Sequence, residues 1–226
     1  MAVECLLNDI PLLQALPPEE KERLRRSLKH LSLRKGDVLF RKDSEGNTLY
    51  IIISGKIKIV LPSTLGEEVV LAVFSDGDFF GEMSLLDGMP RSADAVALEK
   101  TELLSLEGSD FITFLQHSQG ALKAVLRSLS LRLRKTDDLL EDTCFLNVSG
   151  RLAKKLVQMV EERGALENNQ ASFELSLTQS ELANMISASR ESVNKELRTL
   201  REKGLISVEK GLLKIHNMER LKRRIK

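Results

Sequence analysis

The sequence of 226 residues is poor in cysteine and histidine. Its two cysteines, Cys5 and Cys144, lie far apart and belong to no motif, which argues against a disulfide scaffold and leaves too few thiolates for a four-cysteine iron–sulfur cluster. The three histidines, His30, His117 and His216, are scattered, whereas structural zinc sites need closely spaced ligands. We therefore expect no metal, no iron–sulfur cluster and no haem.

Long hydrophobic runs are also absent. No apolar run approaches ~18 residues, so the sequence predicts no membrane span and no membrane partner. The first residues include Glu4 and Asp9 and lack the basic start and apolar core of a signal peptide. Reduced cysteines and the lack of a signal peptide together predict a cytoplasmic protein. No nucleophile–base pair stands out either, so we do not expect an enzyme.

The charge is unevenly divided along the chain, although the formal net charge is only +1. Residues 1–146 carry 18 Lys+Arg and 23 Asp+Glu, whereas residues 147–226 carry 16 and 10. The sequence thus indicates an acidic module followed by a basic one. Basic modules often meet phosphate backbones, but an excess of this size is weak evidence by itself.

Short segments rich in β-formers follow one another between about residues 31 and 97. They cover residues 38–40, 49–53, 56–60, 69–74 and 93–97, and glycine-containing turns separate them at Gly36, Gly46, Gly55, Gly66 and Gly77. Several short strands at regular spacing with glycine turns are typical of a β-sandwich or barrel.

One stretch within this half, residues 80–93, combines a carboxylate, an arginine and a hydroxyl around a short turn of helix. Glu82 can accept hydrogen bonds from a sugar hydroxyl. Arg91, followed by Ser92, can hold a phosphate, because the guanidinium fork matches the phosphate oxygens. The stretch therefore offers both halves of a ribose–phosphate site.

Helical spacing takes over from about Ser109. A series of five leucines and one threonine then recurs at separations of 4, 3, 4, 3 and 4 residues. Its members are Leu122, Leu126, Leu129, Leu133, Thr136 and Leu140. This a/d seam predicts a helix that pairs with the same helix of a second chain, with packing onto its own domain as the alternative. Thr136, the one polar residue of the seam, is either a register device or, beside a nucleotide site, a ligand contact.

Residues 145–150 break this periodicity and are interpreted as a hinge. Asn147 or Ser149 can cap the next helix, which we expect from Arg151 to about Glu162. The polar span 163–172 is predicted to be a loop, and the alternating residues 172–177 a short strand.

The remaining residues have the pattern of a winged helix-turn-helix. Thr178 and Glu181 form a capping box that begins a short helix. Residues 187–188 then make a turn, and Ser189 caps a second helix from Arg190 to about residue 203, with Gly204 at its end. Residues 205–215 have the pattern of a β-hairpin.

The start of the second helix of such a unit enters the major groove. Arg190 and Lys195 can donate to guanine, and Glu191 can accept from the cytosine amino group. The alternative for Glu191 is that it only supports the helix N-terminus through the dipole. Helix starts also offer backbone amides to phosphates. The predicted DNA-binding residues are Ser149, Thr178, Gln179, Ser189, Arg190, Glu191, Ser192 and Lys195.

Three motifs in this order carry a resemblance over almost the whole chain: the stretch at 80–93, the hinge at 145–151 and the helix-turn-helix residues 189–195. The chain resembles the cyclic-AMP receptor protein branch of the Crp/Fnr transcription regulators. The resemblance implies an α+β fold with an N-terminal cyclic-nucleotide-binding β-roll (jelly-roll-like), a long dimerisation helix and a C-terminal winged helix-turn-helix. The domains would cover residues 1–116, 117–146 and 147–226.

The resemblance also implies roles for matching residues. Glu82 would bind the ribose 2′-hydroxyl, and Arg91 and Ser92 the cyclic phosphate. The remaining members of the predicted cyclic-nucleotide site are Gly81, Met83, Ser84, Arg132, Thr136 and Asp137. Backbone amides of residues 81–84 would help to hold the phosphate, and Thr136 would contact adenine across the subunit boundary.

Three positions depart from the family pattern. Ser187 stands in the tight turn where glycine is common, and serine tolerates this position with some strain. Asp137 stands where serine or asparagine is common; it can accept from the adenine amino group, or it can merely solvate the helix flank. Lys195 stands where some relatives have arginine, and lysine loses the bidentate fork. By resemblance, the ligand is cyclic AMP and the operator a pseudo-palindrome with TGTGA-like half-sites, with a looser guanine preference at the Lys195 position.

The implied partners are double-stranded DNA, a second copy of the chain, and RNA polymerase. Two alternatives stay open. One is a regulator of the same type that works without a ligand or senses another small molecule. The other is a cyclic-nucleotide-sensing module that acts on a partner protein.

Overall fold

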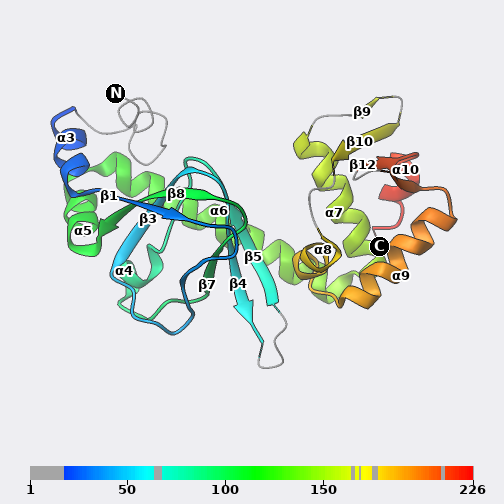
Figure 1. Cartoon of the computed structure of the whole chain (residues 1–226), viewed down its shortest axis with the longest axis horizontal. Helices are drawn as coiled ribbons and strands as arrows, with labels where there is room; N and C mark the ends of the chain where they lie inside the picture. The colour runs from blue at the N-terminus through cyan, green and yellow to red at the C-terminus, as the bar shows by residue number, and fades with distance from the viewer. Residues whose placement is uncertain are drawn as a thin grey trace. The chain divides into compact units, whose positions relative to one another are not determined.

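The computed structural model describes residues 18–63, 68–163, 166–167, 169–174, 178–209 and 212–225. The chain divides into two compact units, Met1–Leu133 and Arg134–Lys226, and the division falls within the long helix α6 (Gln119–Phe145). Each unit has a hydrophobic core of its own. The expected α+β class, with a sheet-rich first part, a long helix and a C-terminal helix-turn-helix, is confirmed (Figure 1).

The first unit is a roll of two four-stranded antiparallel sheets. One has the order β1-β8-β3-β6 and the other the order β2-β7-β4-β5. The first sheet consists of β1 (Lys29–Leu33), β8 (Thr101–Glu107), β3 (Thr48–Ser54) and β6 (Phe79–Phe80). The second consists of β2 (Val38–Phe40), β7 (Asp94–Ala97), β4 (Ile57–Pro62) and β5 (Glu68–Phe74).

Strand β3 shows how the roll is filled, because successive side chains of a strand point to opposite faces. Leu49 and Ile51 belong to one core, which they share with helix residues such as Phe111. Tyr50 and Ile52 belong to the other core, which includes residues of the second sheet. The first sheet is therefore covered on one face by helices and on the other face by the second sheet.

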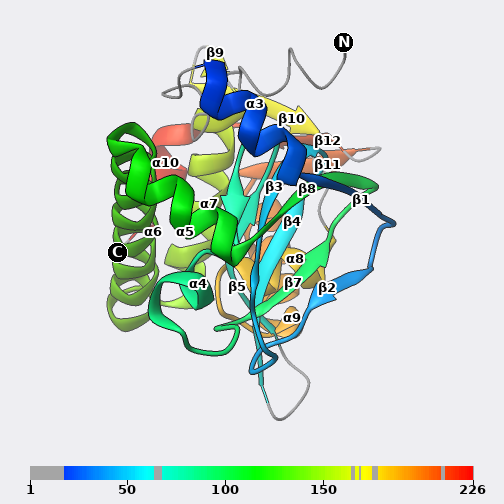
Figure 2. The same cartoon turned by 90° about the vertical axis from the view of Figure 1, so that its left-hand side faces the viewer.

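Among the described residues of the first unit, four helices accompany the roll. They are α3 (Pro18–Ser27), α4 (Met83–Asp87), α5 (Gly108–His117) and the first part of α6. Helices α3 and α5 contact one another, and α5 also packs on β3 and β8 (Figure 2). The start of α6 closes this core with Ala121 and Val125, which are almost completely buried.

The five predicted strand segments correspond to β2, β3, β4, β5 and β7, but three strands were not predicted. Strand β1 carries the polar residues Lys29, His30 and Ser32, β6 is two residues long, and β8 carries two glutamates. Their strand conformation depends on pairing partners far along the chain, such as Leu31 with Leu103 and Tyr50 with Phe80. The turn expected at Gly66 lies outside the described residues.

The second unit surrounds one core with helices and a four-stranded sheet. The helices after α6 are α7 (Val148–Arg163), α8 (Gln179–Met185), α9 (Arg190–Glu202) and α10 (Met218–Lys222). The sheet has the order β11-β12-β10-β9, with β11 (Ile206–Glu209), β12 (Leu212–Ile215), β10 (Gln170–Glu174) and β9 (Leu166–Glu167). The predicted hairpin is confirmed as β11 and β12. No helix in the described part of the chain combines the length and apolar character that a membrane crossing needs.

The loop prediction for residues 163–172 is wrong, because β9 and the start of β10 lie there. Polar residues dominate this span, so its sequence carries little strand signal. The strand forms because β10 pairs with β12, for example Phe173 with Leu213, both of which are buried in the core. The proposed strand at 172–177 is described only to Glu174. Helix α10 was not predicted.

The structure decides between the two possible caps of α7. Asn147 Oδ1 accepts a hydrogen bond from the backbone N–H of Gly150 at 2.9 Å, so Asn147 is the cap. Ser149 is the second residue of a helix that begins at Val148 rather than at Arg151. The interpretation of Ser149 as a cap is therefore wrong.

The turn between α8 and α9 is held by an arginine that the sequence did not point to. Arg151 Nη1 donates to the carbonyl oxygens of Ile186 and Ser187 at 2.8 and 2.9 Å. Ser187 has φ +50°, in the left-handed region that favours glycine. A non-glycine residue at this position strains the backbone.

Ser187→Gly should therefore raise the free energy of unfolding of the second unit by about 1 kcal/mol, because glycine adopts positive φ without the side-chain clash. Urea unfolding followed by circular dichroism measures the change. Ser187→Ala is the matched control, since alanine keeps the clash, and it should give no gain. Equal stability of the glycine and alanine variants would show that the turn is not strained at this residue.

Candidate functional site

Glu82, which immediately precedes α4, is buried and paired with Arg132 of α6. Its side chain is 1% exposed, and its Oε1 accepts a hydrogen bond from Arg132 Nη1 at 2.6 Å. Arg132 Nη2 donates to the carbonyl oxygen of Phe79. Glu82 Oε2 is buried without a hydrogen-bond partner. A buried carboxylate oxygen that lacks a donor is costly, and a ligand hydroxyl would satisfy it.

Arg91 is the second buried ion of this region and is 4% exposed. Its Nη1 donates to the carbonyl oxygen of Gly81 and its Nη2 to that of Thr48, both at 2.8 Å, while its Nε is buried without a partner. Burial lowers the pKa of the Arg91 guanidinium, although the charges of Tyr50 and Glu82 act in the opposite direction. Arginine nevertheless stays a cation, so the site offers a positive charge to an anion.

The loop between β2 and β3 lies directly against Arg91. The backbone N–H of Asp43 donates to the Arg91 carbonyl oxygen at 2.8 Å, and the Arg91 N–H donates to Ser44 at 2.9 Å. A Cβ atom on Gly46 would lie 2.6 Å from Arg91 Nε and 2.7 Å from Ser84 Oγ. Glycine at this position allows the loop to approach the two side chains, and the sequence had suggested only a turn here.

The other predicted nucleotide contacts are arranged as follows. Ser84 is buried, and Ser92 is exposed with its hydroxyl 3.7 Å from the Met83 sulfur. The structure thus brings Gly81, Glu82, Met83, Ser84, Arg91, Ser92 and Arg132 together around α4. Thr136 and Asp137 are exposed on α6 and belong to the second unit. Their contact with a ligand stays a prediction.

Aromatic side chains near both arginines were not foreseen. The Arg91 guanidinium carbon lies 4.3 Å from the ring centroid of Phe40, and that of Arg132 lies 4.4 Å from the ring centroid of Phe74. Tyr50 is also within reach of Arg91, at 5.8 Å. The sequence signal was weak: each ring is one β-former in a strand segment, and a single sequence does not tell which rings meet.

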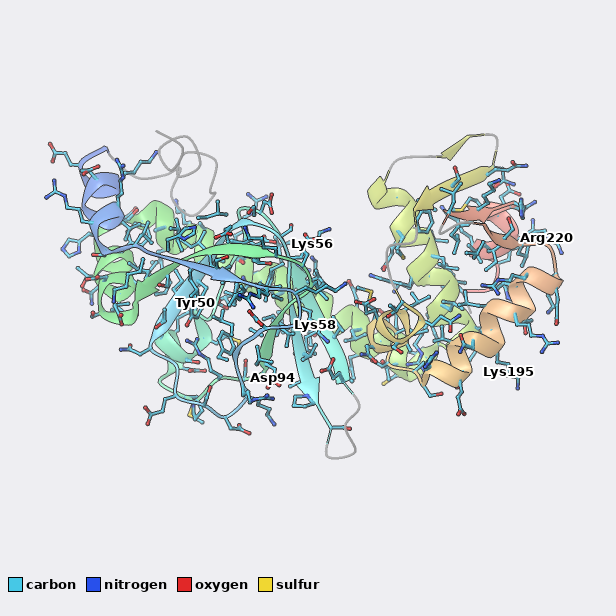
Figure 3. The ribbon with its side chains drawn as sticks, viewed as in Figure 1. Tyr50, Lys56, Lys58, Asp94, Lys195 and Arg220 are labelled. Carbon is cyan, nitrogen blue, oxygen red and sulfur yellow. The ribbon has the colours of Figure 1, made fainter. Side chains whose placement is uncertain are left out.

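Helix α9 presents the predicted DNA-reading residues on one side and its apolar residues on the other. Arg190, Glu191 and Lys195 are exposed, whereas Val193 and Leu197 are buried in the core of the second unit. Figure 3 labels Lys195 on this helix. The spacing of buried and exposed residues follows the 3.6-residue period of an amphipathic helix.

The predicted caps of α8 and α9 are confirmed. Thr178 accepts from the backbone N–H of Glu181 at 3.2 Å, and the Glu181 carboxylate accepts from the Thr178 N–H at 2.7 Å. Ser189 accepts from the Ser192 N–H at 3.1 Å, and the two hydroxyls are 2.9 Å apart. Gln179 is exposed in the first turn of α8. DNA contact by these residues stays a prediction.

Comparison with known proteins assigns both units. Residues 30–118 match the model of the cyclic nucleotide-binding domain, and residues 150–224 match that of the Crp-like helix-turn-helix domain. A domain of the first kind followed by one of the second defines a class of transcription regulators, not of enzymes. The chain belongs to the Crp/Fnr family of this class, whose members bind DNA through the helix-turn-helix.

Two of the similar proteins match over nearly their whole length. The CRP-like cAMP-activated global transcriptional regulator of Mycobacterium tuberculosis is 33% identical over 213 residues, which cover 94% of this chain and 95% of that protein. The cyclic AMP receptor protein of Thermus thermophilus is 31% identical over 206 residues, which cover 91% and 92%. The c-di-GMP responsive regulator CLP of Xanthomonas campestris shares the fold, with a TM-score of 0.77 at 24% identity over 89% of this chain and 100% of that one.

The buried ion pair of Glu82 and Arg132 can be tested without a ligand. Arg132→Met should lower the free energy of unfolding of the first unit by about 3 kcal/mol, because it leaves the Glu82 carboxylate buried without its partner. The double variant Glu82→Met/Arg132→Met should recover most of this loss, since neither side chain then needs solvation. Urea unfolding measures both variants. Equal destabilisation by the single and double changes would contradict the interpretation of Glu82 and Arg132 as a buried ion pair.

Proposed function

We propose that this protein is a homodimeric, cyclic-AMP-responsive transcription regulator that binds a pseudo-palindromic operator with TGTGA-like half-sites. The observation that carries the proposal is the pair of buried ions around α4: Glu82 has a carboxylate oxygen without a donor, and Arg91 has an Nε–H without an acceptor. A cyclic nucleotide supplies both missing partners, a ribose hydroxyl for Glu82 and an anionic phosphate for Arg91.

The choice of cyclic AMP rests on the names of the two similar relatives and on the seam of α6. Thr136 would contact the adenine from the second subunit, as the family pattern implies. Asp137 would accept from the adenine amino group and repel the guanine carbonyl oxygen. Cyclic AMP should therefore bind more tightly than cyclic GMP.

The proposed dimer interface is the apolar seam of α6. Leu122, Leu126, Leu133 and Leu140 are 43%, 54%, 63% and 63% exposed, whereas Leu129 packs partly against the core of its own unit. Leucines at a/d spacing that remain exposed in a single chain are well suited to knobs-into-holes packing with a second copy of the helix. This favours a homodimer over packing within one chain.

The proposed switch links ligand binding to the hinge. Thr136 precedes the hinge residue Asn147 by about 11 residues, which is ~16 Å along a helix. A ligand that contacts both subunits near Thr136 stabilises one arrangement of the paired helices and thereby fixes the two α9 helices for major grooves ~34 Å apart. It acts only through its different affinity for the two arrangements.

The proposal includes RNA polymerase as a partner and places the protein in the cytoplasm, where a bacterial chromosome lies. A second candidate is a regulator of the same family with another ligand. The c-di-GMP responsive regulator with the same fold shows that relatives differ in this respect. Calorimetry with cyclic AMP, cyclic GMP and c-di-GMP distinguishes these ligands directly.

Saturating cyclic AMP should raise operator affinity on the order of tenfold or more, within the usual range of coupling free energies. Fluorescence anisotropy with a labelled operator at fixed salt measures this, because salt alone changes DNA affinity strongly. The same titration without ligand is the control. Identical operator affinity with and without cyclic AMP would remove the switch and leave a constitutive DNA-binding protein.

Arg190→Ala should weaken operator binding by about 2 kcal/mol and relax the preference for guanine at one position of each half-site, because a bidentate contact to guanine is lost. Arg201→Ala removes the same charge from the last turn of α9 and is the matched control. The Arg201→Ala change should reduce affinity for all DNA sequences alike, and by less than the Arg190→Ala change does. Unchanged sequence preference in the Arg190 variant would argue against base reading by this residue.

A further inference from the structure

The two arginines of the proposed nucleotide site are connected through one group of aromatic rings. The guanidinium of Arg91 lies over the ring of Phe40, and that of Arg132 lies over the ring of Phe74. Phe80 contacts both rings, with centroid distances of 6.1 Å to Phe40 and 5.9 Å to Phe74. The rings and the two cations form a continuous series from the proposed phosphate end to the proposed sugar end.

These rings come from separate strands. Phe40 ends β2 and Phe74 ends β5, which are the two edge strands of the same sheet. Phe80 belongs to β6, an edge strand of the other sheet, and stacks on Tyr50 of β3 at 5.6 Å. Figure 3 labels Tyr50 within this roll. The two alanines of β7 that belong to the same core, Ala95 and Ala97, leave room for large rings nearby.

We propose that Phe74 and Phe40 are positioning residues of the nucleotide site, each for one arginine. Phe74 orients Arg132 so that the second oxygen of Glu82 stays available to the ligand's 2′-hydroxyl. Phe40 orients Arg91 at the phosphate end. The inference rests on the proposed function, because it assigns roles to the residues that surround the proposed cyclic-nucleotide site.

The geometry of Arg132 explains the role of Phe74. An arginine often grips a carboxylate with two parallel hydrogen bonds, and such a grip would occupy both oxygens of Glu82. Here one Nη of Arg132 bonds Glu82 Oε1 and the other bonds the Phe79 carbonyl oxygen. The ring of Phe74 against the guanidinium stabilises this orientation by a cation–π contact in a partly desolvated place. Glu82 Oε2 remains without a partner as a consequence.

Replacing the ring at position 74 by an aliphatic side chain removes this restraint. Arg132 can then rotate so that it donates to both oxygens of Glu82, and it competes with the ligand for Glu82 Oε2. The loss of binding affinity should appear only for a ligand that has a 2′-hydroxyl. At the other end, Arg91 donates both Nη groups to the carbonyl oxygens of Gly81 and Thr48. Loss of the ring at position 40 should therefore weaken binding of the phosphate, a group that every cyclic nucleotide carries.

The experiment is calorimetry of the full-length protein with cyclic AMP and with its 2′-deoxy analogue. Phe74→Leu should weaken binding of cyclic AMP on the order of tenfold and that of the 2′-deoxy analogue by less than about twofold. Phe40→Leu, the matched control, should weaken both nucleotides by a similar factor. Phe74→Tyr keeps an aromatic face and should retain the discrimination of the original protein.

Thermal unfolding verifies that each variant is folded, and Phe74→Met, which keeps a large apolar side chain without a ring, takes the place of Phe74→Leu if the latter is not. An equal loss of affinity for both nucleotides in the Phe74→Leu or Phe74→Met protein would overturn the inference. A defect in ordinary packing would weaken binding of both nucleotides alike, whether or not they carry a 2′-hydroxyl. Failure of the unchanged protein to bind either nucleotide is a different result, and it would overturn the proposed function together with this inference.

Discussion

The buried ion pair between Glu82 and Arg132 is the interaction on which the proposed site depends. A carboxylate that is 1% exposed needs a compensating cation, and Arg132 supplies it from α6 at 2.6 Å. The pair uses only one carboxylate oxygen, so the second remains for a ligand. The same contact ties the start of α4 to α6, the helix that carries the proposed dimer seam. The Glu82–Arg132 ion pair thus connects the proposed nucleotide site to α6, the helix proposed to transmit the effect of binding.

Arg91 is the second buried ion of the site, and its guanidinium bonds the carbonyl oxygen of Gly81, which lies two residues before α4. It is buried without a carboxylate partner, and its charge is compensated by two backbone carbonyl oxygens and an aromatic face. Such an arrangement stabilises the cation without neutralising it, so a positive charge remains for an anionic ligand. Strand residues contact both arginines, Phe40 and Thr48 at Arg91 and Phe74 and Phe79 at Arg132. The roll therefore prepares the charges of the site before a ligand arrives.

Much of this could be read from local sequence patterns. The strands at 38–40 and 57–62, the capping box at Thr178 and the cap at Ser189 follow rules that involve only neighbouring residues. Strands β8 and β9 and the start of β10 were missed, because their polar residues weaken the strand pattern and their conformation depends on pairing partners. Arg151, whose guanidinium holds the turn at Ser187, was missed for the same reason: the two residues are far apart in sequence.

The sequence by itself determined the family, the order of the two domains and the chemical types in the site, because these depend on motifs of a few adjacent residues such as Glu82 with Arg91–Ser92. Only the tertiary structure decided which groups meet. It showed that Arg132 takes one oxygen of Glu82 and that Phe40 and Phe74 lie against the two arginines. It also showed that Asn147 rather than Ser149 caps α7. The physical reason is that burial and hydrogen bonding depend on distances between segments, which a one-dimensional pattern does not contain.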